Sequence, residues 1–246
     1  YRLRITVRGK RTSDDANVQC QKILQAKIHR CNITKMRALD LEEFVASGTG
    51  TSSVQLVGNG TYNRPFQIYT YDDLQKVRDA FNAADDAKSD PVINGQAVKG
   101  VGETGGPTYF KICRSDIVIP SGSVWNTGIK GFKGYMITET SSANRGIITN
   151  NSGNPLFESI SNLGKVENIY MSGSVTVAAI DDFSPFCYVN SGTILNCHNN
   201  CDVTVDVPNS GSHAMHIAGL CAINHGTING GANSGDLCSD SSNVAG

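Results

Sequence analysis

The first residues of the chain alternate strictly between apolar and polar side chains. Residues 1–8 read YRLRITVR, and this period of two predicts a half-buried β-strand, with a second one suggested over 26–34. Two or three strands cannot enclose a hydrophobic core. We therefore expect residues 1–46 to form a short β module, either the end of a β-sandwich or a piece that packs on the next part of the chain. A glycine- and serine-rich linker over 47–56 joins it to the rest.

One helix stands out, over residues 71–84. Four apolar residues line one face at helical spacing: Leu74, Val77, Phe81 and Ala84. Thr70 is the expected N-cap, and Asp73 three residues later makes a carboxylate version of the capping box. The next segment, 85–106, is polar and rich in glycine, so we expect an exposed, mobile loop there.

After residue 109 the chain consists of short apolar stretches separated by Gly, Asn and Ser, and an internal repeat emerges. Its anchors are Gly164, Gly192 and Gly226, which lie 28 and 34 residues apart. The residues two, nine and eleven positions later also match: Val166, Ile194 and Ile228; Gly173, Cys201 and Gly235; Val175, Val203 and Leu237. Apolar residues two apart, with many β-branched side chains, indicate short strands and exclude helices.

A repeat with one apolar face cannot bury that face alone, whereas stacked copies bury a continuous core. The pattern therefore predicts an all-β protein, a right-handed parallel β-helix over residues 57–246, with Asn and Gly at the corners where left-handed backbone angles are needed. The helix over 71–84 comes just before the coils. We expect it to cap the open end of the solenoid and to shield the first strand edge.

Several segments resemble known sequences. The likeness rests on GNGTYNRPFQIYTYDDL at 58–74, YFKICRSDI at 109–117, Trp125, GFKG at 131–134, PLF at 155–157 and Gly219-Leu220. Over about 55–240 the chain resembles bacterial surface β-helix domains of the GLUG-repeat type, although FKGY at 132–135 replaces their usual FDGNG. The resemblance implies a secreted or surface-anchored protein of Bacteroidales or Firmicutes, of a kind mostly regarded as adhesin-like.

Charge is unevenly distributed behind a formal net charge of −1. Residues 151–246 contain eight acidic residues and a single cation, Lys165. A surface that binds nucleic acid or another polyanion needs clustered Lys and Arg, so this region is a poor candidate and no nucleic-acid partner is expected. No run of 18 apolar residues occurs, so no membrane span is expected. An export signal is expected to lie outside this sequence, and further coils or an anchor after it.

Two constellations suggest chemistry. Asp181 and Asp182, with His225, resemble the paired aspartates and histidine of polygalacturonase-like β-helix hydrolases, which need an acid and a base around a water. However, His225 aligns with Ser191 of the preceding repeat, which favours a solvated corner. We therefore expect no catalytic residues, and a polysaccharide hydrolase using these three is the alternative.

The second constellation contains metal-ligand side chains. Cys197, Cys201, His213 and His216 nearly have the spacing of a Cys2His2 zinc site, but the ββα pattern of such a finger is absent. Cys201 takes the place of two repeat glycines, which we interpret as a corner. We expect neither a metal nor a cofactor. Disulfides are the other possibility: Cys197 with Cys201, Cys20 with Cys31, or Cys187 with Cys221, which share a repeat position and otherwise stack in the core.

Aromatic residues could provide a sugar-stacking platform, although each also sits where a strand or cap needs filling. The set is Tyr62, Phe66, Tyr69, Tyr71, Trp125, Phe132, Tyr135 and Tyr170, of which Trp125, Tyr135 and Tyr170 are the ligand-binding candidates. The sequence thus predicts a non-catalytic, adhesin-like bacterial surface protein that binds an extracellular glycan or a host surface protein through its β-helix face and loops. A structural stalk is a further alternative, and the oligomeric state is open.

Overall fold

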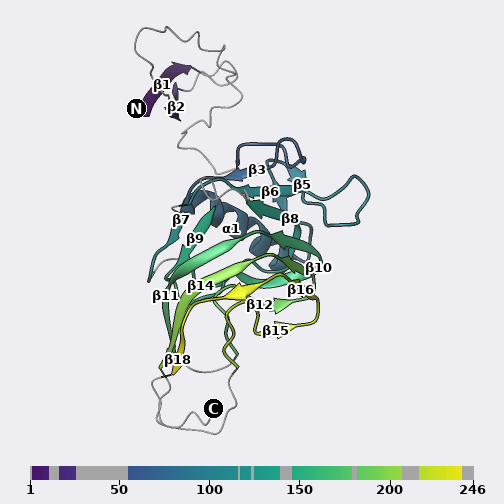
Figure 1. Cartoon of the computed structure of the whole chain (residues 1–246). Coiled ribbons are helices and arrows are strands. Elements are labelled where there is room, and N and C mark those ends of the chain that lie inside the picture. The colour runs from purple at the N-terminus through teal and green to yellow at the C-terminus, as the bar shows by residue number, and fades with distance from the viewer. Residues whose placement is uncertain are drawn as a thin grey trace.

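Parallel β-strands stacked into a solenoid dominate the computed structural model of the chain (Figure 1). The structure describes residues 2–10, 17–25, 55–115, 117–122, 125–138, 146–178, 182–206 and 216–239. Figure 1 shows the coils stacked from the β3 end to the β18 end. The predicted all-β parallel β-helix is therefore confirmed.

Two parallel sheets form the walls of the solenoid. The first contains β3 (Phe66–Ile68), β6 (Tyr109–Ile112), β8 (Phe132–Thr138), β10 (Phe157–Glu167), β12 (Cys187–Asn190), β13 (Thr193–Leu195), β15 (Ile223–Asn224) and β16 (Thr227–Asn229). The second contains β7 (Ile117–Ile119), β9 (Ile147–Asn150), β11 (Tyr170–Ala178), β14 (His198–Asp206), β17 (Ala232–Asn233) and β18 (Leu237–Ser239). Within the described residues, each coil from β6 onward contributes strands to both walls, whereas the first coil contributes β3 to the first sheet alone.

Strand register confirms the sequence repeat residue by residue. Val166 pairs with Ile194, and Ile194 pairs with Ile228. In the second sheet, Gly173 pairs with Cys201, and Val203 pairs with Leu237. The repeat also extends upstream of the predicted copies, because Gly164 pairs with Gly134 of β8.

The anchor glycines are required by close packing between coils. A Cβ at Gly192 would collide with the carbonyl oxygens of Gly164 and Ser161, and a Cβ at Gly226 would collide with the carbonyl of Gly192. The left-handed corner lies four residues further on, where Asn168, Asn196 and Gly230 have φ of 58°, 50° and 65°. Asparagine and glycine tolerate this conformation, which turns the chain from the first sheet to the second.

A column of phenylalanines fills the interior. Successive coils contribute Phe66, Phe110, Phe132, Phe157 and Phe186, all at most 1% exposed. Neighbouring ring centroids along the column are 5.7, 5.8, 5.3 and 5.8 Å apart, in tilted or edge-on arrangements that aromatic pairs prefer. Inward positions of the short strands thus build one continuous core.

The helix α1 (Tyr71–Ala87) begins as predicted and continues three residues beyond the predicted end. Thr70 is its N-cap, and the Thr70 Oγ1 atom accepts a hydrogen bond from the Asp73 backbone N–H at 3.1 Å. The Phe81 ring lies 6.1 Å from Phe110 and 5.3 Å from Phe132, so the buried helix face completes the core.

The capping helix at this end of the solenoid is confirmed, and a strand shares the end with it. Strand β3 precedes α1 in the chain and already belongs to the first coil. The free edge of β3 is covered by Val57, whose carbonyl accepts the Gln67 N–H at 2.8 Å. The helix packs against β3, β4 and β7, and β3 and β7 are the first strands of the two sheets, so α1 covers the core of the first coils.

The expected loop over 85–106 contains structure of its own. Strands β4 (Val92–Ile93) and β5 (Gln96–Ala97) form an antiparallel hairpin across the turn Asn94-Gly95, with φ of 50° and 76°. The Asn94 side chain accepts the Leu56 N–H at 2.8 Å and donates to the Leu56 carbonyl at 2.6 Å. An Asn-Gly pair favours a tight hairpin turn, which explains why this segment is not a plain loop.

The N-terminal segment is a β-hairpin of β1 (Arg2–Lys10) and β2 (Asn17–Gln25), paired antiparallel from Arg2↔Gln25 to Lys10↔Asn17. The first predicted strand is confirmed, whereas the second predicted strand, over 26–34, lies outside the described residues. Most of the predicted linker, 47–54, also lies outside them. Leu56 at its end is 4% exposed and belongs to the solenoid core.

Candidate functional site

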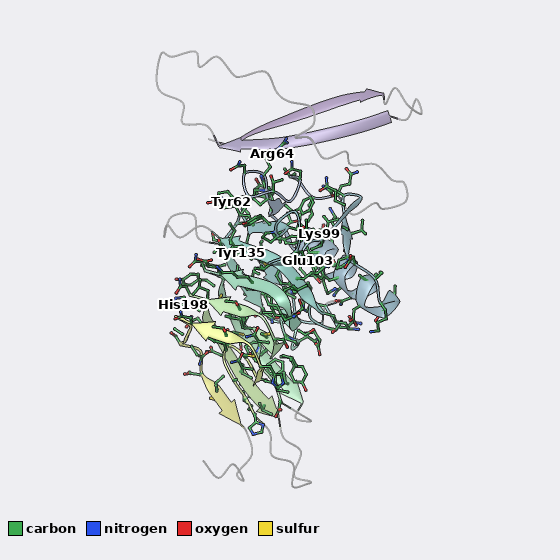
Figure 2. The ribbon with its side chains drawn as sticks, turned by 90° about the vertical axis from the view of Figure 1, so that its right-hand side faces the viewer. Tyr62, Arg64, Lys99, Glu103, Tyr135 and His198 are labelled. Atoms are coloured by element: carbon green, nitrogen blue, oxygen red, sulfur yellow. The ribbon has the colours of Figure 1, made fainter. Side chains whose placement is uncertain are left out.

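The outer face of the first sheet carries a row of tyrosines across successive coils. Tyr109 of β6 and Tyr135 of β8 are directly paired, and their ring centroids are 5.3 Å apart. Tyr62, in the turn before β3, lies 5.4 Å from Tyr109 in an edge-on arrangement. Figure 2 shows Tyr62 and Tyr135 along one side of the face, with Lys99 and Glu103 beside them. We call Tyr62, Tyr109 and Tyr135 the tyrosine row.

Strand alternation sets the direction of these side chains. In β6, Phe110 and Ile112 are buried, so Tyr109 and Lys111 face outward, and β8 repeats the pattern at Tyr135. Tyr62 is held by a tight turn in which the Asn59 N–H donates to the Arg64 carbonyl at 2.9 Å. The Tyr62 side chain is 71% exposed, so its ring is the most accessible part of the row.

A charged pair closes the other end of the row. The Lys165 ammonium lies 4.4 Å from the centre of the Tyr135 ring, and it lies 3.1 Å from Glu167 Oε2. The Tyr135 hydroxyl donates to the same Glu167 carboxylate. Burial alone would raise the pKa of Glu167, but the hydrogen bonds from Tyr135 and Lys165 outweigh it and lower that pKa. For Tyr135, burial and then the hydrogen bond to Glu167 raise the pKa.

A charged loop, residues 99–106, borders the row on one side. Backbone hydrogen bonds attach it, since the Thr108 N–H donates to the Lys99 carbonyl at 2.9 Å and the Val101 N–H donates to the Leu163 carbonyl at 2.7 Å. Within the loop, the Glu103 carboxylate accepts the Gly100 N–H, which lowers the Glu103 pKa. The loop thus lies as a fixed wall beside the tyrosines.

Lys133 connects this wall to the sheet. The Lys133 ammonium lies 2.6 Å from Asp90 Oδ1 and 3.5 Å from Glu103 Oε2, with the side chain only 11% exposed. The hydrogen bond from Lys133, together with its charge, lowers the pKa of Asp90. One ammonium thus serves two carboxylates, and the charge of Lys99 adds a weaker favourable interaction with both.

The three predicted ligand-binding residues lie in different parts of the structure. Trp125 is fully buried, and its indole N–H donates to the Pro155 carbonyl at 3.1 Å, so it is a core residue and was wrong as a ligand platform. Tyr135 lies in the tyrosine row. Tyr170 lies on the second sheet, stacked on His198 with 4.5 Å between ring centroids and 9° between planes. The structure therefore does not bring the three candidates together.

The hydrolase constellation is divided in the structure. Asp182 contacts His216, with Oδ1 2.7 Å from the His216 Nδ1 atom, and the hydrogen bonds from His216 lower the Asp182 pKa. His225 is exposed in the turn between β15 and β16, in register with Ser191 as the repeat predicted. Asp181 lies outside the described residues. What the structure joins is thus Asp182 with His216, a pairing that the sequence pattern does not predict.

The zinc-like cysteines face the core. Cys197 and Cys201 are both fully buried, and burial raises each thiol pKa to about 12, which disfavours the thiolate that binds metal. His216 is engaged with Asp182, and His213 lies outside the described residues. Within the described part of the chain, no three His, Cys, Asp or Glu side chains are grouped so that they could hold a metal ion.

The cysteine alternatives are partly decided. Cys197 and Cys201 are free thiols, and four residues of extended chain span about 13 Å, too far for a disulfide. Cys201 also lies within β14 rather than at a corner. Cys187 and Cys221 are free thiols in register on adjacent coils, as predicted for a core stack. Cys31 is outside the described residues, so its pairing with Cys20 stays a prediction.

Sequence reasoning missed the tyrosine row, because Tyr109 was not among the aromatic candidates. Extending the glycine anchors upstream to Gly134 would have aligned Tyr135 with Lys165. One further step of the same kind does not find Tyr109, because Tyr109 lies only 26 residues before Tyr135, a shorter spacing than the 28 and 34 residues between the glycine anchors.

A comparison of the chain with protein-family models, curated proteins and solved structures gave no match. The resemblance to GLUG-repeat domains therefore stays a prediction. In the described part of the chain, no helix has both the length and the apolarity needed to cross a bilayer.

Proposed function

We propose that this protein is a non-catalytic, adhesin-like bacterial surface protein that binds an extracellular glycan across the tyrosine row. The observation that carries the proposal is the unbroken series of Tyr62, Tyr109 and Tyr135 on one outward face, with ring spacings of 5.4 and 5.3 Å. Tyrosine offers a rigid apolar surface and a hydroxyl, at little cost in conformational entropy. This combination suits sugar rings, which have apolar faces and hydroxyl edges.

The solenoid supports binding of an extended ligand. Because Tyr109 and Tyr135 come from neighbouring strands, their positions repeat at the spacing of a sheet, about 4.8 Å, and the turn before β3 adds Tyr62. The face is held rigid by Lys165 and Glu167 at one end and by the attached loop 99–106 along one side. A preorganised face loses little entropy when a polymer lies along it.

The charge states support a non-catalytic role. Among the described residues, four carboxyl groups have shifted pKa values, those of Asp90, Glu103, Glu167 and Asp182, and all four are lowered. A glycosidase acid needs a raised pKa in order to hold its proton near neutral pH. The Asp182–His216 contact is the observation that keeps a polysaccharide hydrolase as the second candidate.

The test is a glycan array probed with the purified chain and two variants. Tyr62→Ala removes the most exposed ring of the row, and we expect it to weaken retention of the bound glycan at least about tenfold, in line with loss of an aromatic anchor. Tyr170→Ala is the matched control, because it removes a half-buried tyrosine from the other sheet. Equal loss in both variants, or loss only in Tyr170→Ala, would move the site away from the row.

The hydrolase alternative is tested on the same polysaccharides by the release of reducing ends. We expect none. Release that disappears in Asp182→Asn would replace the adhesin proposal with the hydrolase. If the chain neither bound a glycan nor released reducing ends, the result would favour a structural stalk.

A further inference from the structure

Two cations border the tyrosine row without a carboxylate partner. Arg64 and Lys99 are both exposed, and neither forms an ion pair within the described part of the chain. The neighbouring carboxylates are in the opposite situation, because Glu103 lies 3.5 Å from Lys133 and Glu167 lies 3.1 Å from Lys165. Lys99 nevertheless acts at longer range on Asp90 and Glu103, which share the single ammonium of Lys133. Around the row, the described cations Arg64, Lys99, Lys133 and Lys165 outnumber the carboxylates Asp90, Glu103 and Glu167, so this face has a net positive charge.

Both cations are fixed next to the rings. Arg64 belongs to the turn that presents Tyr62, where its backbone N–H donates to the Thr61 carbonyl at 3.1 Å. Lys99 is bonded through its backbone to Thr108, the neighbour of Tyr109: its N–H donates to Thr108 Oγ1 at 2.8 Å. Figure 2 shows Arg64, Tyr62 and Lys99 on the same face as Tyr135.

We infer that the ligand of the tyrosine row is an acidic glycan, whose carboxylate or sulfate groups meet Arg64 and Lys99 while its sugar rings lie on the tyrosines. This inference rests on the proposed function and names its ligand class. A guanidinium binds carboxylate and sulfate oxygens in pairs, and a lysine adds a mobile point charge. A polymer with an apolar ring face and a regularly placed anion matches this arrangement.

Charge along the solenoid limits where such a ligand binds. Residues 151–246 have eight acids against Lys165, and Lys165 is already paired with Glu167. Asp202 and Asp236 are exposed on the last coils. A polyanion is repelled there, so the contact is confined to the first coils.

The same argument favours a glycan over single-stranded nucleic acid. Stacking platforms for nucleic acid lie in grooves where basic residues follow a phosphate at every nucleotide. Here the two exposed cations outside any ion pair, Arg64 and Lys99, lie at the Tyr62 end of the row and on its flank. A ligand with spaced anions fits this face better than one with an anion on every unit.

The experiment uses an array on which uronate, sulfated and sialylated oligosaccharides are each printed beside a neutral counterpart, with oligothymidylate included. The double variant Arg64→Gln/Lys99→Gln removes the two cations and leaves the rings. Its matched control, Lys76→Gln/Lys88→Gln, removes the same charge from α1 and its C-cap residue, where each lysine lies near an aspartate. Tyr62→Ala reports on the row itself.

We expect binding to acidic glycans only, about fivefold weaker for each cation removed, unchanged in the α1 control, and weaker at higher salt. The inference would be overturned if neutral glycans bound as well as acidic ones, and if Tyr62→Ala weakened this binding while the double variant did not. The proposed function would then still stand. If the double variant no longer bound acidic glycans but Tyr62→Ala bound them normally, the role of the tyrosine row would be overturned and the role of the cations would stand. Preference for oligothymidylate, or no binding at all, would overturn both.

Discussion

Glu167 shows how neighbouring side chains decide what a single residue does. Its carboxylate receives the Tyr135 hydroxyl and the Lys165 ammonium, and the side chain is 21% exposed. Burial would favour the protonated acid, yet the two donors hold the charged form and lower the pKa. One carboxylate thereby orients both groups at the inner end of the tyrosine row.

The Glu167 contacts should make stability depend on pH. Because the folded pKa lies below the unfolded value of about 4.3, the stabilisation is present above that value and is lost as the pH falls through the folded pKa. We expect Glu167→Gln to lower the free energy of unfolding by about 0.5–1 kcal/mol at pH 7, and the gap to close below about pH 4. Urea unfolding followed by circular dichroism across this range measures it.

Glu158→Gln is the matched control for this change. Glu158 accepts a hydrogen bond from the Thr127 hydroxyl at 3.3 Å, and no lysine or arginine forms an ion pair with it in the described part of the chain. A wild-type to Glu167→Gln difference that stays constant with pH, or that Glu158→Gln reproduces, would contradict the role assigned to the Glu167 charge.

At the scale of the element, buried asparagines replace part of the strand ladder at the corners. Asn190 is fully buried at the end of β12, where its Oδ1 atom accepts the Gly192 N–H at 3.1 Å. Its Nδ2 atom donates to Asn224 Oδ1 of the next coil at 2.7 Å. Asn199 and Asn233 repeat the side-chain contact at 2.8 Å on the second sheet. These ladders satisfy backbone groups where strands break.

We expect Asn190→Ala to lower the free energy of unfolding by about 1–3 kcal/mol, because it leaves the Gly192 N–H buried without its partner. Urea denaturation of the purified variant measures the loss. Asn162→Ala, at an exposed position of β10, should cost less than about 0.5 kcal/mol. Similar losses in the two variants would mean that the ladder contributes nothing specific.

At the scale of the whole molecule, the last coil is the least protected. Ile228 and Leu237 are 37% and 41% exposed, although their counterparts Ile194 and Val203 on the preceding coil are at most 1% exposed. Among the described residues, this coil has a neighbouring coil on one side only, and stability in solenoids is a sum of contacts between neighbours. The interior coils, with the phenylalanine column, have neighbours on both sides.

Hydrogen exchange followed by mass spectrometry should therefore show a gradient along this chain. We expect the amides of β15 to β18 to exchange fastest within the solenoid and those of β8, β10 and β11 slowest. Uniform protection from β3 to β18 would indicate that the solenoid opens as one unit.

The candidate site was only partly accessible from sequence. Tyr135 was named, but Tyr109 was not, and Trp125 was chosen although it is buried. Aromatic side chains fill cores and present surfaces with equal ease, so residue type cannot separate Trp125 from Tyr135. The face of the sheet on which each side chain lies depends on the number of residues in each coil, and that number changes by several residues from coil to coil.

The sequence by itself determined the repeat and its consequence. Gly164, Gly192 and Gly226 recur because successive coils pass too closely for a Cβ, and the apolar residues two apart require strands. Stacking then results, since one apolar face needs another to cover it. The tertiary structure alone decided how α1 closes the first coils and which partners the polar side chains take. Glu167 with Tyr135, and Asp182 with His216, are contacts between residues whose spacing in the chain does not encode their distance in space.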